Sequence, residues 1–259
     1  MVINALDRQG QKLWFPYWGA KKGSCLRLFC LHYAGGSASL FRNWQQMMPP
    51  GVEVCAIQLP GREARISEAP LSQMEEVVQT LAQVLAPYLD LPFILFGHSM
   101  GALVSFELAR QLRREGLPMP MHLFVSAFRA PQMPYRLPRL HALEHDTFVQ
   151  SLHRLDSIPK ELLANEEFLQ HVIPLLRADF ALCEEYNYVA ERPLDCSISV
   201  FGGLTDDRVT RQELLGWRAQ TKAPFVLQMF PGDHFFLHST QNQLLQVISE
   251  VLTRFIDTL

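Results

Sequence analysis

Short apolar runs alternate with longer amphipathic segments along most of the chain. Apolar residues at helical spacing fill residues 71–88, 100–114 and 243–256. This alternation is typical of a mostly parallel sheet flanked by helices, so the sequence predicts an α/β fold. The predicted strands, all rich in Val, Ile, Leu and Phe, are residues 26–32, 52–59, 93–97, 123–127, 198–202 and 225–230.

Two polar pairs mark the predicted starts of helices. Ser72 with Glu75, and Thr210 with Glu213, have the spacing of a capping box, in which each side chain accepts from the other residue's backbone N–H. We therefore expect one helix to begin at the first pair and another at the second.

Residues 140–186 break the alternation. They contain helical stretches at residues 146–155 and 165–177 and no run that resembles a strand. A helical insertion between two strands would lie over the carboxyl edge of the sheet, where such folds place their sites. We interpret it as a lid, with plain cover of the core as the alternative. The predicted organisation is a core of residues 1–139, the lid, and a second part of the core at residues 187–259.

Composition narrows the classes of function. The 259 residues are 48% hydrophobic, which is enough for one large domain, and the formal net charge is -3 with both signs interspersed. Such a chain has no overall basic field that would hold nucleic acid or an anionic membrane surface. Because the start lacks a basic and apolar leader, and no run approaches the ~20 apolar residues of a membrane span, we expect a cytoplasmic protein. The 5 cysteines match neither a disulfide framework nor a zinc motif, so we expect reduced thiols, no metal and no cofactor.

Residues 97–101 read Gly-His-Ser-Met-Gly and match the nucleophile-elbow pattern G-x-S-x-G. The pattern alone is weak, because chance supplies it in roughly one chain in ten of this length. Its flanks make it specific, since a buried-strand run ends at the motif and a helical run begins directly after it. We predict Ser99 as a nucleophile in an α/β-hydrolase fold, with helix capping by Ser99 as the alternative.

A serine hydroxyl needs a base, and in this fold the base follows the last strand. His234 lies directly after the last predicted strand, whereas its nearest competitor, His238, is expected to enter the final helical segment. The orienting acid should lie between serine and histidine in the chain. Asp206 and Asp207 follow the strand at residues 198–202. We select Asp206 and keep Asp207 as a rival, and capping of the next helix is the alternative for both.

An oxyanion hole needs two backbone N–H donors, one after the nucleophile and one from the loop after an early strand. Met100 supplies the first. The first predicted strand ends in His32-Tyr33-Ala34-Gly35-Gly36, and we predict the Ala34 N–H as the second donor. A Gly-Gly pair after a strand is also an ordinary turn.

With these pieces in place, the sequence resembles the type II thioesterases, the stand-alone partners of polyketide and nonribosomal peptide synthetases. The Leu-Pro-Gly-Arg run at residues 59–62 is the most discriminating segment, because general esterases do not usually carry it. Two positions depart from the family pattern. His32 stands where Pro is usual, and Asp156-Ser157-Ile158-Pro159 replaces a Gly-rich hinge in the lid. The shared segments are residues 30–36, 58–65, 97–102, 174–180, 203–209 and 231–237.

The resemblance implies a function. It implies hydrolysis of acyl or aminoacyl groups from the phosphopantetheine thiol of carrier proteins, which clears stalled or misprimed synthetases by a Ser-His-Asp acyl-enzyme mechanism. A carboxylesterase or lipase acting on soluble oxygen esters is the alternative enzyme, and a catalytically silent hydrolase-fold binding protein is the alternative from another class. We expect a monomer, and the sequence does not specify the acyl group or the pathway.

One stretch of the chain is basic. Residues 116–143 contain no acidic residue but include Arg129, Arg136 and Arg139. The stretch leads from the fourth predicted strand into the lid, so it should border the entrance to the site. Carrier proteins are, as the resemblance implies, typically acidic beside the phosphopantetheine arm. We predict these arginines as a docking surface, and the alternative is a solvated loop whose arginines pair with acids elsewhere.

Overall fold

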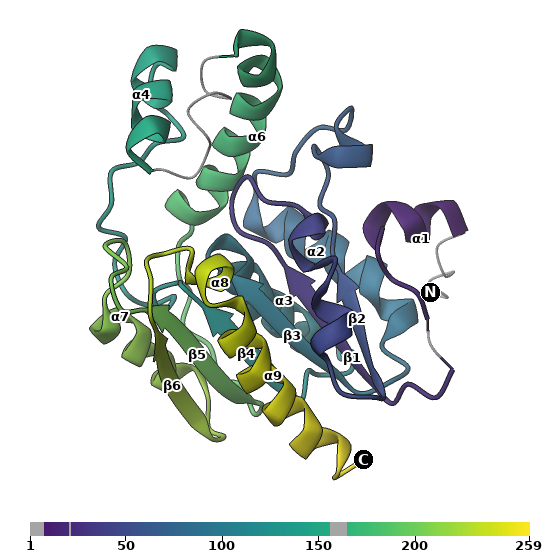
Figure 1. Ribbon diagram of the computed structural model, residues 1–259. Helices are drawn as coiled ribbons and strands as arrows, with labels where there is room; N and C mark the ends of the chain where they lie inside the picture. Colours follow the sequence, from purple (N-terminus) through teal and green to yellow (C-terminus); the bar gives the residue numbers. More distant parts are fainter. Residues whose placement is uncertain (1–7, 21, 156–164) are drawn as a thin grey trace.

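The computed structural model describes residues 8–20, 22–155 and 165–259. Within this part of the chain, six strands form one sheet in the order β2-β1-β3-β4-β5-β6, and every neighbouring pair is parallel (Figure 1). The predicted mostly parallel sheet is confirmed. The strands are β1 Leu26–Leu31, β2 Val52–Ala56, β3 Phe93–His98, β4 His122–Ser126, β5 Ser197–Gly203 and β6 Phe225–Phe230.

Five of the six strands match their predicted ranges to within one residue at each end, whereas β2 ends three residues early. The N–H of Ile57 still bonds the carbonyl of Cys30 in β1, but the N–H of Gln58 turns to the carbonyl of Trp14. Trp14 ends the first described helix, α1 Arg8–Trp14. Ile57 and Leu59 lie in the same buried core cluster as Trp14, so the apolar run continues after the strand has ended.

Alternate strand residues fill two cores, one on each face of the sheet. On one face, Phe29 and Leu31 pack with helices α2 Met74–Leu85 and α3 Met100–Arg114. On the other face, Leu28 and Cys30 pack with α9 Gln241–Ile256, which crosses the front of the sheet in Figure 1. The period of two along β1 therefore distributes one continuous apolar run between both helical layers.

Only one of the two predicted capping boxes forms. Helix α2 begins at Met74 with Gln73 as its N-cap, so the predicted Ser72–Glu75 box is wrong: Ser72 lies one residue too early to accept from the first turn. The box of Thr210 with Glu213 is present and opens α7 Arg211–Leu215.

Helices α4 His145–Leu155 and α6 Glu166–Glu184 lie between β4 and β5 in the chain and project beyond the carboxyl edge of the sheet (Figure 1). Phe148 and Leu152 of α4 pack with Leu169, Ile173 and Leu176 of α6 in a small core of their own. The Asn165 side chain caps α6 by accepting from the Phe168 N–H at 3.0 Å. The predicted helical insertion is present, and its second helix extends seven residues beyond the predicted end, to Glu184. The predicted hinge at residues 156–159 lies outside the described residues.

The remaining short elements connect these layers. They are α8 Phe236–Ser239 and the 3-10 turns Ala38–Phe41, Trp44–Met47, Glu63–Arg65, Ala86–Tyr88 and Gly216–Gln220. Among the helices described here, none has the length and apolar character needed to cross a membrane.

Candidate active site

Ser99 lies in the sharp turn between β3 and α3. Its backbone has φ 51° and ψ -118°, and its N–H donates to the carbonyl of Ser126 at 2.7 Å. The flanking glycines make the turn sterically feasible: a Cβ on Gly97 would lie 2.0 Å from the Gly101 carbonyl oxygen, and one on Gly101 would lie 2.2 Å from that of Leu31. The Ser99 side chain makes no capping bond to α3, so the capping alternative is wrong. Its hydroxyl is available for another role.

The side chains of Ser99, His234 and Asp206 form a chain of hydrogen bonds. His234 Nε2 lies 3.0 Å from Ser99 Oγ, and His234 Nδ1 lies 2.9 Å from Asp206 Oδ2. A carboxylate only accepts, so Nδ1 carries the proton and Nε2 is left to accept from the Ser99 hydroxyl. The structure therefore brings the three predicted residues together in the predicted order.

The two candidate acids lie in different environments. The Asp206 side chain is 1% exposed, and its second oxygen, Oδ1, accepts from the N–H groups of Arg208 at 2.8 Å and Val209 at 3.2 Å. Asp207 is exposed. The turn after β5 thus fixes Asp206 toward His234 and turns Asp207 toward solvent.

A second histidine, which sequence reasoning did not select, connects the parts of this site. His98 Nε2 lies 3.0 Å from the backbone carbonyl of His234, and His98 Nδ1 lies 2.8 Å from Ser126 Oγ. Burial lowers the pKa of His98 well below its usual value, and the nearby His234 lowers it further. A neutral ring with its proton on Nε2 donates to the carbonyl and accepts from the Ser126 hydroxyl. The only sequence signal was the position of His98 inside the elbow motif.

The loop after β1 lies beside Ser99. Among the described residues, neither the N–H of Ala34 nor that of Met100 has a protein acceptor. His32 lies at the start of this loop: burial, together with the charge of Arg62, lowers its pKa to about 3, and its Nδ1 lies 2.9 Å from the carbonyl of Tyr33. His32 therefore stays neutral and acts as a fixed donor inside the loop.

A cavity of about 630 Å³ opens on Ser99 and His234. The helical insertion contributes an apolar part of its wall through Phe180 of α6, together with Leu140 and Leu143 from the segment before α4. The site is therefore a serine and a histidine at one end of a cavity with an apolar wall.

The structure separates the three arginines that were predicted as one docking surface. Arg129 is 8% exposed, its Nε donates to the carbonyl of Met133 at 3.2 Å, and its guanidinium lies 4.8 Å from the Tyr135 ring centroid. It forms part of the cavity wall, so its prediction as a docking residue is wrong, because the chain turns inward after β4. Arg136 and Arg139 are exposed, and Arg136 borders the cavity.

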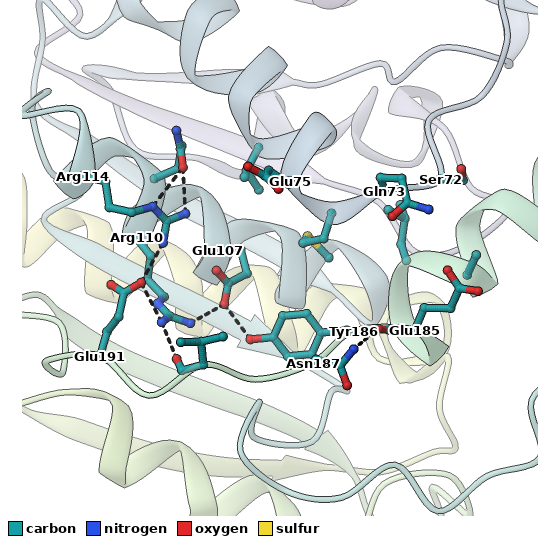
Figure 2. A pocket seen from close by; sticks show the side chains of 16 residues that line it. Ser72, Gln73, Glu75, Glu107, Arg110, Arg114, Glu185, Tyr186, Asn187 and Glu191 are labelled. Carbon is teal, nitrogen blue, oxygen red and sulfur yellow. Dashed lines mark hydrogen bonds and ion pairs between the residues drawn. The ribbon is translucent and has the colours of Figure 1, made fainter.

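Figure 2 shows side chains that line a second cavity, between α2, α3 and the end of α6. The volume of this cavity is about 430 Å³. The residues that line it and those that line the Ser99 cavity form two separate sets. Four of its charged side chains, those of Glu107, Arg110, Arg114 and Glu191, form one network of ion pairs. Arg110 bonds Glu107 at 2.6 Å and Glu191 at 2.8 Å, and the Tyr186 hydroxyl donates to Glu107 at 2.6 Å. This network fastens residues 186–191 to α3.

The parallel sheet, the strained serine between strand and helix, and the histidine after the last strand define a serine hydrolase of the α/β-hydrolase fold. Residues 26–254 match the thioesterase domain family, and the chain belongs to that family.

Known proteins match this chain over most of its length, both in sequence and in structure. The gramicidin S biosynthesis protein GrsT of Aneurinibacillus migulanus is 43% identical over 239 residues, which are 92% of this chain and 93% of that protein. RedJ, a thioesterase of the prodiginine biosynthetic pathway in Streptomyces coelicolor, has a solved structure that superposes with a TM-score of 0.82 at 35% identity and covers 93% of this chain and 98% of that one.

Another relative carries a different name. The linear gramicidin dehydrogenase LgrE of Brevibacillus parabrevis is 45% identical over 232 residues, which are 88% of each chain. The dinucleotide fingerprint begins with two glycines in the spacing G-x-G, and this spacing occurs nowhere in the present sequence. The glycine pattern here is that of the elbow, so the thioesterase family is the assignment that the sequence and the site support.

Proposed function

We propose that this protein hydrolyses acyl or aminoacyl thioesters on the phosphopantetheine arm of carrier proteins, and so clears stalled or misprimed polyketide or nonribosomal peptide synthetases. The observation that carries the proposal is the hydrogen-bonded chain from Ser99 through His234 to Asp206, which opens on a cavity in a member of the thioesterase family. The names of GrsT and RedJ, which place them in gramicidin S and prodiginine biosynthesis, support this kind of pathway.

In the first half-reaction, Ser99 Oγ attacks the thioester carbonyl while His234 Nε2 takes the hydroxyl proton. Asp206 holds the imidazole in the required tautomer and stabilises its positive charge. The tetrahedral oxyanion accepts from the N–H groups of Ala34 and Met100, which have no protein acceptor in the described part of the chain. The C–S bond then breaks and the pantetheine thiolate leaves.

The leaving group suits this machinery. A thiol has a pKa of ~8.5, so the thiolate leaves with little help from a general acid, and the proton on His234 neutralises it. In the second half-reaction, His234 takes a proton from the water that attacks the acyl-enzyme and returns it to Ser99 Oγ as the acyl–oxygen bond breaks, which releases the carboxylic acid and free Ser99. These steps use only side chains, backbone N–H groups and water, so the proposed mechanism includes no metal and no cofactor.

A comparison of leaving groups tests the reaction class. The protein is incubated with an acyl-pantetheine thioester and with the oxygen ester of the same acyl group, and kcat/KM is measured for both. A thioesterase should prefer the thioester by at least about tenfold, because the better leaving group matters more when no general acid is specialised for an alkoxide. A preference for the oxygen ester would instead support a carboxylesterase.

We further propose that Arg136 and Arg139 form part of the surface that docks the carrier protein. Both are exposed, and Arg136 borders the cavity that opens on Ser99. Charges at the rim of an interface mainly steer encounter and do not touch the chemistry. Arg136→Glu and Arg139→Glu should each raise KM for an acidic acyl-carrier protein by about threefold or more, whereas kcat/KM for a small acyl-pantetheine stays unchanged.

Two comparisons make this docking test specific. Arg254→Glu makes the same change in charge on the exposed last turn of α9 and should leave both substrates unaffected. The carrier reaction alone should also weaken between ~0.05 and ~0.5 M salt, because screening shortens the Debye length. Equal effects of Arg136→Glu on both substrates would show that the arginine serves the fold.

We propose that the protein is a monomer, since the proposed reaction uses the residues of one chain and a carrier protein, and we propose that it acts in the cytoplasm. Sedimentation of the purified protein, alone and with an acyl-carrier protein, should show one copy of each in the complex. Two copies of this chain per complex would contradict the monomer.

A further inference from the structure

The loop that carries the Ala34 N–H is held by a carboxylate from the lid. Asp179 of α6 accepts from the Gly35 N–H at 2.7 Å through Oδ2, and Arg62 Nη2 lies 2.7 and 2.8 Å from its two oxygens. We propose that Asp179, anchored by Arg62, is a positioning residue that aims the Ala34 N–H at the oxyanion. The proposal rests on the proposed function, because it assigns these residues a part in the same site.

The pair is buried at the junction of lid and core. The side chains of Asp179 and Arg62 are 1% and 4% exposed, so water solvates neither charge and the two groups compensate each other. A buried ion pair contributes little net stability compared with apolar side chains of the same volume. Its geometry is specific, however: with Arg62 between its two oxygens, the carboxylate can turn only a little, and Oδ2 stays aimed at the Gly35 N–H.

The backbone of the loop is built for close contact with α6. Gly35 has φ +76°, and a Cβ at this position would lie 2.6 Å from Leu176 Cδ2 of α6. The left-handed backbone therefore favours glycine, and any larger residue here would also have to displace the Leu176 methyl group. The Gly35 and Ala34 N–H groups belong to consecutive peptides, separated only by the φ and ψ of Ala34. Fixing the first restrains the direction of the second.

The segment around Arg62 holds the other side of the same loop. Gln58 Oε1 accepts from the Ala38 N–H at 2.7 Å, and Gln58 Nε2 donates to the carbonyl of Arg62 at 3.2 Å. Glu63 accepts from the Ser37 hydroxyl at 2.6 Å. Gln58 and Glu63, which flank the Leu-Pro-Gly-Arg segment, and Asp179 of α6 thus hold the oxyanion loop between them, although the Ser-His-Asp chemistry uses none of these residues.

The test separates positioning from stability. In Asp179→Leu, kcat for an acyl-pantetheine should fall about 10- to 100-fold while KM changes less than about threefold, because the loop contact matters for the oxyanion and not for the bound thioester. The rate at which a fluorophosphonate labels Ser99 should fall by a similar factor. Asp179→Asn should lose about three- to tenfold, since its amide oxygen can still accept from the Gly35 N–H.

A matched control comes from another buried ion pair. Glu53 of β2 lies 3.1 Å from Arg27 Nε, and its side chain is 3% exposed. Glu53→Gln should lower Tm as much as Asp179→Asn does and leave kcat and the labelling rate unchanged. Arg62→Lys, which keeps a positive charge beside Asp179, should retain more activity than Arg62→Met.

Several results would overturn the proposal. They are a kcat for Asp179→Asn equal to that of the wild type, a loss confined to KM, or an equal loss of kcat in Glu53→Gln. The Asp179→Asn result decides the matter if Asp179→Leu does not fold. A wild-type protein that fails to hydrolyse acyl-pantetheine would contradict the proposed function alone, because the labelling rate of Ser99 still reports on the position of the Ala34 N–H.

Discussion

The ring of His98 donates a hydrogen bond to the backbone carbonyl of His234 at 3.0 Å, across 136 residues of chain. The residue before the proposed nucleophile therefore holds the loop of the proposed base. The Ser126 hydroxyl donates to the other ring nitrogen, and the Ser126 carbonyl accepts from the Ser99 N–H. Ser126 and His98 thus connect the backbones of Ser99 and His234.

Because of this connection, replacing His98 should lower activity although the His98 side chain makes no contact with substrate. His98→Leu leaves the His234 carbonyl and the Ser126 hydroxyl without their buried partner, so kcat should fall about tenfold or more with little change in KM. Steady-state kinetics on an acyl-pantetheine measures both constants. An unchanged kcat in a folded His98→Leu protein would show that the loop of His234 is held by other contacts.

The turn after β5 predicts unequal roles for two adjacent acids. Asp206→Asn should lower kcat by up to ~10⁴, because an amide beside His234 Nδ1 favours the wrong tautomer, whereas Asp207→Asn should stay within about threefold of the wild type. Both variants remove one negative charge, so each controls for the other. A larger loss of kcat in Asp207→Asn than in Asp206→Asn would assign the orientation of His234 to Asp207.

Close packing at the elbow predicts a large steric effect. In Gly101→Ala, the new methyl group would lie 2.2 Å from the Leu31 carbonyl oxygen, so the backbone of β1 or α3 must move. The free energy of unfolding should drop by about 3 kcal/mol or more. Gly19→Ala is the matched control, because no atom lies within 4 Å of its new Cβ, and it should change stability by less than about 0.5 kcal/mol. Urea unfolding measures both, and similar losses would contradict the packing argument.

The buried His122, at the start of β4, should make the free energy of unfolding depend on pH. Burial lowers its pKa from 6.5 to about 3. Between these values the unfolded chain binds a proton that the folded chain does not, so the free energy of unfolding falls as the pH decreases. In His122→Gln, which does not titrate, the slope of this fall should be shallower by up to about 1.4 kcal/mol per pH unit. Urea unfolding from pH 7 to pH 4 measures the slopes, and equal slopes would contradict a buried neutral His122.

The parts that could be predicted from the sequence depend on local signals. The six apolar runs predict the strands, and the flanks of the elbow place Ser99, because a strand, a turn and a helix are each encoded within a few residues. The order of nucleophile, acid and base along the chain, which this fold requires, then selects Asp206 and His234.

The parts that were missed depend on contacts between distant segments. His98 faces Ser126 only because β3 and β4 pair in that register. Asp179 and Gly35 are 144 residues apart in the chain, and no sequence pattern around either residue predicts their hydrogen bond. Arg129 was misplaced for the same reason, since the segment after β4 is held by residues far along the chain: Trp217 Nε1 donates to the carbonyl of Phe128, and the Ala130 N–H donates to the carbonyl of Glu213.

The most direct test of the central claim is the intact mass of an acyl-carrier protein after incubation with this protein. The wild type should remove the acyl group and leave the carrier with its free phosphopantetheine thiol. Ser99→Ala, with unchanged far-UV circular dichroism, should remove it at least ~10³ times more slowly. A carrier that keeps its acyl group with the wild type, or loses it to Ser99→Ala at a rate within about tenfold of the wild-type rate, would contradict the account.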